Sequence, residues 1–397
     1  MSSAGGLLAG IEVVEFGNLI AAPYAGMLLA DLGADVVKVE PPGGDLGRGF
    51  GPYVGGESVF FMAVNRGKRS LALNPKDPEV RPWLDRLVSR ADVVINNLRH
   101  GAMARMGYDE QTIRNVNPGV VYVVVSAFGA DGPYADRAGI DVIFQAESGM
   151  ISLTGRPDDP PEKTATTIGD YVAATNAALT ICAALVDRER GGSGRRVDIS
   201  LRDGLLPVQS GWYALHFASG SQPERTGTAS PYLAPNQVFE TADGLLALAI
   251  VSDRHFRILA DRLRRPDLAE RYRTNQERMA NRPGLAAALE ETFGEHTTAH
   301  WLNLLGDAGL PVGRVMDLAQ VLDDPQILHN EMVLEVEHPA AGRTTALGSP
   351  LRVDGRPARA ERPSPCLGQH SRQILADLGA PDETIEELVR TGGIVVS

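Results

Sequence analysis

The amino-acid sequence predicts an α/β fold, in which strands alternate with helices and pair in a largely parallel sheet. The clearest observation is a βαβ unit near the start of the chain. Residues 11–16 are typical of a strand, residues 23–32 (PYAGMLLADL) of a helix, and residues 35–40 of a second strand. Because parallel strands need a crossover connection between them, this order favours a parallel pair.

Further strands and a long helix support the same fold class. Residues 91–97 and 120–126 are mostly apolar, as expected for parallel strands that helices cover on both faces. Residues 171–186 carry apolar side chains at spacings of three and four, without proline or glycine, which predicts a mostly buried helix. A glycine-rich turn follows, and residues 197–201 alternate apolar and polar side chains like a strand.

Composition excludes several classes of function. The chain has 397 residues, enough for about two to three domains, and a formal net charge of −12, which argues against a nucleic-acid or membrane-surface role. Its two cysteines, Cys182 and Cys366, fit no metal or redox spacing, so we expect a reducing, cytoplasmic setting. The first ten residues do not resemble a signal peptide, and the most apolar window, residues 177–186, is too short to span a bilayer.

The βαβ unit invites a dinucleotide-binding interpretation, because Glu40 ends the second strand where a ribose-binding acid would lie. The loop after the first strand, residues 17–23 (GNLIAAP), lacks the spaced glycines that let a backbone approach a pyrophosphate. The sequence therefore argues against a nicotinamide cofactor.

Basic residues are concentrated in the first part of an otherwise acidic chain, within or just after the predicted strands. Loops at the carboxyl ends of strands are where open α/β sheets bind ligands, so these cations could bind phosphates. The alternative is an ordinary solvated charged face. The residues are Lys38, Arg66, Lys68, Arg69, Lys76, Arg99 and Arg105.

A second domain is expected to begin near a predicted β-hairpin at residues 236–250, which turns at Asp243 and Gly244. Helical patterns follow over residues 256–263, 285–293 and 300–308, and the tail at 371–389 predicts two short helices. His296 and His300 are four residues apart, but no HExxH pattern accompanies them, so we expect no zinc site there.

Asp170 is the candidate for chemistry, because it lies where the long predicted helix begins. Unpaired backbone N–H groups and the helix dipole favour an ionised carboxylate at such a position. An ionised carboxylate can attack a carbonyl carbon. The alternative is that Asp170 is simply the N-cap of the helix, a common position for aspartate.

Several ordered segments, taken together, resemble the family III CoA-transferases, which include formyl-CoA and carnitine-CoA transferases. The resemblance spans nearly the whole chain. It is carried by LAGIEVVEFGNLIAAPYAGMLLADLGADVVKVEPPGGD, NRGKRSLALNPKDPE, the long segment from NNLRHGAMARMGYDE to GIDVIFQAESGM, the Asp170 stretch, PYLAPNQVFETADG, GLPVGRVMDL and PCLGQHSRQILADLG.

The resemblance implies an interlocked homodimer of ring-like chains. Each chain would have a Rossmann-like large domain (1–215), a smaller α+β domain (216–330) and a C-terminal segment (331–397) that returns to the large domain. It also implies that Asp170 attacks an acyl-CoA thioester, so that an aspartyl-CoA thioester forms and passes CoA to a carboxylic acid. Coenzyme A is then a substrate, and neither a metal nor an organic cofactor is required.

The resemblance also implies CoA-binding residues, each carried over from a matching position: Leu73, Asn74 and Lys76 at the nucleotide end, Asn97 and Arg99 beside the pantetheine and phosphates, Arg105, and more loosely Arg137. Three features depart from one family member. Pro41 replaces an adenine-binding arginine, Ile20 replaces an active-site glutamine, and no glycine-rich lid is visible in residues 230–244. The first departure removes an adenine contact, and the other two disfavour formyl and oxalyl substrates.

Two alternatives to transfer remain. The same fold serves 2-methylacyl-CoA racemases, which use a histidine in a GHDINY-like segment; here the segment is GIDVIF, with Ile140 at the histidine position. Because an aliphatic side chain cannot exchange a proton, the racemase interpretation lacks one partner. The other alternative is a CoA-binding protein without turnover.

Overall fold

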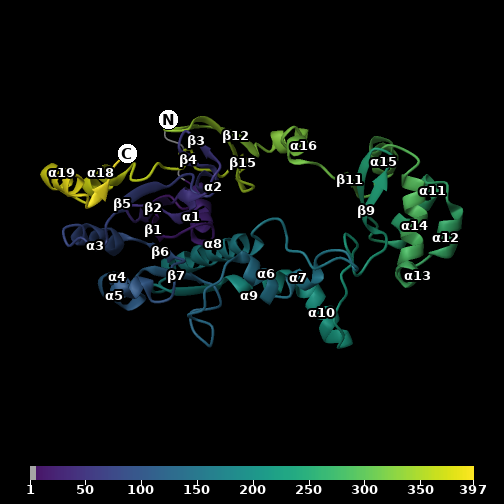
Figure 1. Ribbon diagram of the computed structural model, residues 1–397, viewed down its shortest axis with the longest axis horizontal. Helices are drawn as coiled ribbons and strands as arrows, with labels where there is room; N and C mark the ends of the chain where they lie inside the picture. Colours follow the sequence, from purple (N-terminus) through teal and green to yellow (C-terminus); the bar gives the residue numbers. More distant parts are fainter. Residues whose placement is uncertain (1–5) are drawn as a thin grey trace. The chain divides into compact units, whose positions relative to one another are not determined.

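The computed structural model describes residues 6–397 and divides the chain into two compact units. Unit 1 contains Met1–Ser148, Thr164–Gly211 and Pro325–Ser397, and unit 2 contains Gly149–Lys163 and Trp212–Asp324. The segment Gly149–Lys163 thus belongs with unit 2, although it lies within the part of the chain that we expected to form the large domain. Figure 1 shows the elements of both units.

Unit 1 is built on a seven-stranded sheet in the order β16-β5-β2-β1-β6-β7-β8. All neighbouring pairs are parallel except β16–β5, which is antiparallel. Without β16, the strand order is that of a doubly wound Rossmann-like sheet, whose direction of winding reverses between β1 and β6. The strands are β1 (Glu12–Phe16), β2 (Asp35–Glu40), β5 (Arg69–Leu73), β6 (Val93–Asn96), β7 (Val121–Ser126), β8 (Arg196–Ser200) and β16 (Ile394–Val395).

Helices cover both faces of this sheet, as the predicted α/β class requires (Figure 1). On one face, α1 (Ala21–Asp31) packs against α8 (Ile168–Glu189) and both contact strands. Alanines on α1 and α8 let these helices approach closely. On the other face, one apolar core joins the strands to α3 (Arg81–Arg90), α5 (Glu110–Val116), α18 (Ser371–Asp377) and α19 (Asp382–Thr391).

The long helix α8 corrects one expectation about length. It has 22 residues and by length and composition could cross a membrane, whereas the sequence suggested no segment long enough. This is weak evidence for a span, because the core helix of a globular protein passes the same test. Ala173, Ala177 and Ile181 are fully buried within unit 1, as expected for a helix that covers a sheet.

The remaining elements of unit 1 are short and lie in the connections. They are η1 (Leu46–Gly49), β3 (Tyr53–Val54), β4 (Glu57–Ser58), α2 (Val59–Ala63), α4 (Ala102–Met106), α6 (Asp141–Glu147), α9 (Leu201–Val208), α17 (Pro325–His329), β12 (Val333–His338), β13 (Gly342–Leu347), β14 (Arg352–Val353) and β15 (Arg356–Pro357). The C-terminal tail returns to the sheet, because β16 pairs with β5.

Unit 2 has its own apolar core under a three-stranded antiparallel sheet, β9 (Asn236–Thr241), β10 (Gly244–Ala249) and β11 (Val312–Arg314). The hairpin turn is one residue earlier than expected, since Gly244 already pairs with Thr241 and the Asp243 carboxylate accepts the Thr298 N–H at 2.7 Å. The helices are α7 (Met150–Leu153), α11 (Asp253–Arg262), α12 (Pro266–Arg271), α13 (Asn275–Ala280), α14 (Arg282–Phe293), α15 (Thr298–Gly306) and α16 (Leu318–Leu322), while α10 (Ser210–Ser219) crosses the unit boundary.

Candidate active site

The loops after β1 and β6 meet where the winding of the sheet reverses, which is the usual ligand position in this fold. Asn97, just after β6, uses its side chain to hold the backbone of Asn18, just after β1. Asn97 Oδ1 accepts the Asn18 N–H at 2.9 Å, and Asn97 Nδ2 donates to the Asn18 carbonyl at 2.9 Å. Asn97 therefore shapes the carboxyl edge of the sheet, and its amide is already engaged within the chain.

A buried ion network also positions the loop that follows β1. Glu15 Oε1 accepts from Lys38 Nζ and Glu15 Oε2 lies beside Lys68 Nζ, both at 2.8 Å, and Lys38 also pairs with Asp45 at 2.8 Å. These side chains are fully buried. Lys38 donates to the Gly17 carbonyl and Lys68 to the Pro23 carbonyl. The network thus holds the first residue of the loop after β1 and the first turn of α1.

This network corrects the interpretation of the basic cluster. Lys38 and Lys68 bind internal carboxylates and are inaccessible to phosphates. Arg66 pairs with Asp31, and Arg69 pairs with Asp35 and Asp377. The three cations that remain exposed, with no ion pair to any residue from 6 to 397, are Lys76, Arg99 and Arg105.

The exposed cations follow two strands of the sheet, Lys76 after β5 and Arg99 and Arg105 after β6. Strands β2 and β1 lie between β5 and β6, so these two strands are about 14 Å apart at ~4.8 Å per step. All three cations follow carboxyl ends of parallel strands and therefore lie toward the same edge. This arrangement suits an extended ligand with several anionic groups.

The other residues expected to contact CoA differ in accessibility. The Leu73 side chain is buried in the core, so only its backbone could face a ligand. Asn74 is partly buried beside the C-terminal tail, where its N–H donates to the Gly393 carbonyl at 2.9 Å. Arg137 is exposed, but its guanidinium is bound by Glu147 and lies over the rings of Phe128 and Tyr134.

Asp170 lies in the first turn of α8 as the third residue of the helix. It is not the N-cap: Thr167 holds that position and makes no side-chain capping bond. The capping bond comes instead from α6, where Asp141 Oδ1 accepts the Gly169 N–H at 2.8 Å. The Asp170 carboxylate makes no hydrogen bond to any other residue in the described range. The capping interpretation of Asp170 is therefore wrong, and the carboxylate remains available.

The electrostatics at Asp170 also differ from expectation. Burial, and secondarily the negative charge of Asp141, raise the pKa of Asp170 from 3.8 to about 7. The favourable helix N-terminus was expected to keep this carboxylate ionised at low pH, but loss of hydration and the second carboxylate outweigh it. A carboxyl group with this property in a weakly solvated position is a candidate for catalysis.

Tyr171, the residue that follows Asp170, contacts Tyr24 on α1. The Tyr24 ring on α1 meets the Tyr171 ring on α8 edge to face, with 4.8 Å between the ring centroids. Burial raises the pKa of both phenols, and at Tyr171 the charge of Asp170 contributes. Both hydroxyls therefore stay protonated near neutral pH and are available as hydrogen-bond donors.

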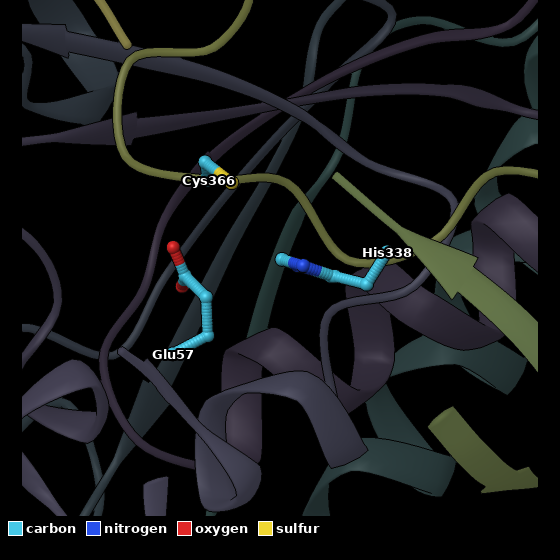
Figure 2. A group of neighbouring side chains, drawn as sticks. All are labelled: Glu57, His338 and Cys366. Atoms are coloured by element: carbon cyan, nitrogen blue, oxygen red, sulfur yellow. The ribbon is translucent and has the colours of Figure 1, made fainter. Parts of the chain in front are cut away.

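Three side chains of metal-binding type converge elsewhere in unit 1, which their sequence spacing did not reveal. Glu57 on β4, His338 at the end of β12 and Cys366 before α18 place one ligand atom each within 4.8 Å of the others (Figure 2). His338 Nε2 is buried and has no hydrogen-bond partner among residues 6–397. Burial and the Glu57 charge raise the pKa of the Cys366 thiol to about 11.

The hydrogen bonds of His338 disfavour a metal at this group. Its Nδ1 accepts the N–H groups of Ala340 at 3.2 Å and Ala341 at 3.1 Å, so the ring proton is on Nε2. A metal-bound histidine normally has the opposite pattern, with one nitrogen on the metal and the other donating its proton. Arg48 Nη1, 3.5 Å from Glu57 Oε2, adds a positive charge that also disfavours a metal cation.

His296 and His300, for which the sequence predicts no zinc site, lie in unit 2. Their rings stack, with 4.2 Å between the ring centroids.

Sequence reasoning missed Asp141 and Gln145 as site residues. The comparison of GIDVIF with GHDINY concerns only Ile140, the residue at the histidine position. Asp141 and Gln145 are four residues apart on α6, the spacing at which helix side chains meet. Gln145 Nε2 donates to Asp141 Oδ2 at 2.5 Å. That spacing was the available signal.

Comparisons with known proteins identify the family of this chain. The family model described as CoA-transferase family III matches residues 8–371. An acetyl-CoA:oxalate CoA-transferase of Acetobacter aceti is 36% identical over 94% of this chain and 96% of its own. A succinate–glutarate CoA-transferase of Agrobacterium fabrum is 36% identical over 96% of each chain.

Among solved structures, a CaiB/BaiF family protein from Brucella suis superposes with a TM-score of 0.85 at 35% identity, covering 94% of this chain and all of the other. The residues matched by the family model include unit 2, all strands of the Rossmann-like sheet except β16, and the helix that carries Asp170. The chain therefore belongs to CoA-transferase family III, the CaiB/BaiF family, and is an enzyme that transfers coenzyme A.

Proposed function

We propose that the enzyme transfers CoA from an acyl-CoA to a carboxylic acid through a covalent aspartyl-CoA thioester on Asp170. The observation that carries the proposal is the state of this carboxylate: it lies at the start of α8, without a hydrogen-bond partner in residues 6–397, and its pKa is about 7. A carboxylate with few hydrogen bonds is a better nucleophile than one that donors stabilise. Near neutral pH a large fraction of it is ionised.

The proposed reaction consists of four exchanges at carbonyl carbons. An Asp170 oxygen attacks the donor thioester, the C–S bond breaks, and a mixed anhydride and CoA thiolate form. The thiolate attacks the Asp170 carbonyl carbon of the anhydride, releasing the donor carboxylate and leaving aspartyl-CoA. The acceptor carboxylate attacks this thioester, again giving an anhydride and thiolate. Attack of the thiolate on the acceptor carbonyl then forms the new acyl-CoA and frees Asp170. No water or net proton is consumed.

We propose dicarboxylic acids as the acceptor class. The support is the naming of two similar enzymes, for oxalate and for succinate and glutarate, all of which are dicarboxylates. The departure at Ile20, the position of the active-site glutamine, disfavours the oxalyl end of this range, so we favour a longer acid such as succinate or glutarate. A panel of acyl-CoA donors and acceptors that differ in chain length would rank them by kcat/KM.

The covalent intermediate is tested on the intact enzyme. The protein is incubated with each acyl-CoA in the absence of acceptor and then treated with borohydride, which reduces an aspartyl thioester to an alcohol of lower mass. Peptide mapping is expected to place the mass loss at Asp170. Transfer activity in the same preparation without any modification of Asp170 would exclude this mechanism.

The exposed cations at the carboxyl edge give a prediction about CoA affinity. Arg99→Ala and Arg105→Ala are each expected to raise KM for acyl-CoA about tenfold with little change in kcat, because each removes a charge-assisted bond of ~1.5 kcal/mol to a phosphate. The measurement is initial-rate kinetics at several salt concentrations. Salt should weaken acyl-CoA binding less in the Arg99→Ala/Arg105→Ala double variant than in the wild type, because fewer charges remain to be screened.

Arg257→Ala is the matched control, since Arg257 is an exposed arginine on α11 in unit 2 and also lacks an ion pair to the described residues. It should leave KM unchanged. An equal rise in KM for Arg257→Ala would mean that the overall charge of the protein, rather than the edge of the sheet, controls CoA binding.

We also propose a cytoplasmic, interlocked homodimer. The exposed face of α8 supports association, because Leu179 and Val186 are 69% and 49% exposed in the single chain. Apolar side chains in such a position are typical of protein interfaces. The cytoplasmic setting is supported by the two cysteines, which are both free thiols. The mass of the protein in solution tests the dimer.

A further inference from the structure

The first turn of α8 is positioned by a side chain from another helix. Thr167 makes no side-chain capping bond, and the carboxylate of Asp141 on α6 takes over this role through the Gly169 N–H. Glycine at 169 permits the approach, because a Cβ atom there would lie 3.0 Å from Asp141 Oδ1. Asp141 thus holds the backbone of the residue that directly precedes Asp170.

Gln145 fixes the orientation of Asp141 in turn. Its Oε1 accepts the backbone N–H of Thr164 at 2.9 Å, so its Nε2 must face Asp141, where it donates to Oδ2 at 2.5 Å. Both side chains are buried, with 6% of Asp141 and none of Gln145 exposed. The pair therefore connects α6, the segment before α8 and the first turn of α8 in one network with a single possible hydrogen-bond direction.

We propose that Asp141, oriented by Gln145, is a positioning residue of CoA transfer, because it fixes the first turn of α8, which carries Asp170. This inference rests on the proposed role of Asp170 as the nucleophile. Asp141 itself forms no bond with the substrate. Its charge acts on Asp170 across a buried region, where charges are poorly screened.

The direction of the hydrogen bonds provides a sharp test. In Asp141→Asn, the side-chain oxygen can still accept the Gly169 N–H. The new NH₂ group then faces the NH₂ group of Gln145, so that two donors oppose each other and the bond between residues 141 and 145 is lost. In the double variant Asp141→Asn/Gln145→Glu, the new amide at position 141 donates to the new carboxylate at position 145, which also accepts the Thr164 N–H. The double variant therefore restores the bonds to Gly169 and Thr164 and the bond between residues 141 and 145, while it gives up the 3.3 Å bond that Gln145 Nε2 donates to the Thr166 carbonyl. It also moves the negative charge one side chain away from Asp170.

We expect Asp141→Asn to lower kcat about tenfold, and the double variant to recover most of that loss. In both variants the acidic limb of the kcat/KM profile should move to lower pH by about half a unit or more, because a like charge near Asp170 is removed or moved away. Gln145→Ala keeps the charge, so it should lower kcat without moving the limb.

Glu189→Gln is the control, because it removes a charge at the far end of α8, roughly 30 Å from Asp170 and beyond the screening length. Its pH profile should match that of the wild type. Melting temperatures show whether each variant is folded, and the double variant keeps the inference testable if Asp141→Asn alone unfolds.

Two results would overturn the inference. One is a wild-type pH limb in both Asp141→Asn and the double variant, and the other is a double variant no more active than Asp141→Asn. Failure of the proposed function itself has a separate signature, because the wild-type enzyme would then transfer CoA without a borohydride-sensitive group on Asp170.

Discussion

Asp170→Asn is expected to abolish CoA transfer while leaving CoA binding intact. The amide has almost the same shape as the carboxylate but cannot form the anhydride or the thioester, so kcat/KM should fall about 10⁴-fold, or ~5.5 kcal/mol in the barrier. The cations at the carboxyl edge of the sheet are unchanged. The dissociation constant for CoA, measured by calorimetry, should therefore stay within about threefold of the wild type.

The same variant should be more stable than the wild type, which excludes unfolding as the cause of lost activity. Because the pKa of Asp170 is about 7 when folded and near 3.8 when unfolded, the folded state binds more protons between these values. The free energy of unfolding of the wild type therefore falls as pH rises from about 4 to 7. Asp170→Asn has no carboxyl group to ionise, so its free energy of unfolding should exceed that of the wild type by on the order of 3 kcal/mol at pH 8.

Urea denaturation at pH 4.5 and pH 8 measures this difference, which should be small at the lower pH. Asp203→Asn, an exposed aspartate on α9, is the control and should be neutral at both values. An Asp170→Asn enzyme that still transfers CoA at a substantial rate, with the asparagine verified by mass, contradicts the proposed nucleophile.

Glu15→Gln is expected to produce the largest loss of stability. Glu15 is the shared ion-pair partner of Lys38 and Lys68, and all three side chains are fully buried. After the substitution, Lys38 still pairs with the Asp45 carboxylate. Lys68 is left with only neutral acceptors, the Pro23 carbonyl and the Asn65 side chain. Removing one member of a buried ion network costs about 3–5 kcal/mol, because a charge is left uncompensated. The loop that Lys38 and Lys68 hold should also loosen, so CoA transfer should slow in the folded fraction.

The pH dependence of the stability of Glu15→Gln tests whether Lys68 is the charge left without a partner. Burial lowers the pKa of Lys68 to about 8 even with Glu15 present, and its loss should lower that pKa further. A lysine whose pKa is lower in the folded state binds fewer protons there, so stability rises with pH up to about 10. The destabilisation of Glu15→Gln relative to the wild type should accordingly be greater at pH 6 than at pH 9.5, because below pH 8 mainly the variant's Lys68 loses its proton.

Glu15→Gln/Lys68→Met should recover much of the loss, because it removes the stranded charge and retains similar volume. Glu335→Gln is the matched control: Glu335 pairs with Arg343, but both are about 70% exposed, and breaking an exposed pair costs less than about 1 kcal/mol. Equal losses from Glu15→Gln and Glu335→Gln would show that burial of the network has no energetic consequence.

Periodicity in the sequence was sufficient to locate most of the sheet. The strands expected at residues 11–16, 35–40, 91–97 and 120–126 correspond to β1, β2, β6 and β7, because each contains consecutive valines or other β-branched apolar residues that are typical of buried strands. The helix bearing Asp170 was also located, although it is six residues longer than expected. The antiparallel strand β16 could not be found, because its two residues are defined only by pairing with β5.

What the sequence by itself determined was the α/β class, the family and the position of Asp170 at the start of a long helix, since all three depend on local patterns and ordered motifs. The partners and the accessibility of the charged side chains were decided by the tertiary structure alone. Whether a lysine contacts a phosphate or a buried carboxylate depends on which residues lie opposite it across the sheet, and Lys38 and Lys68 could not be distinguished from Lys76 without that information. Likewise, the ionisation of Asp170 depends on burial and on Asp141, which is 29 residues away in the chain and adjacent to it only in the fold.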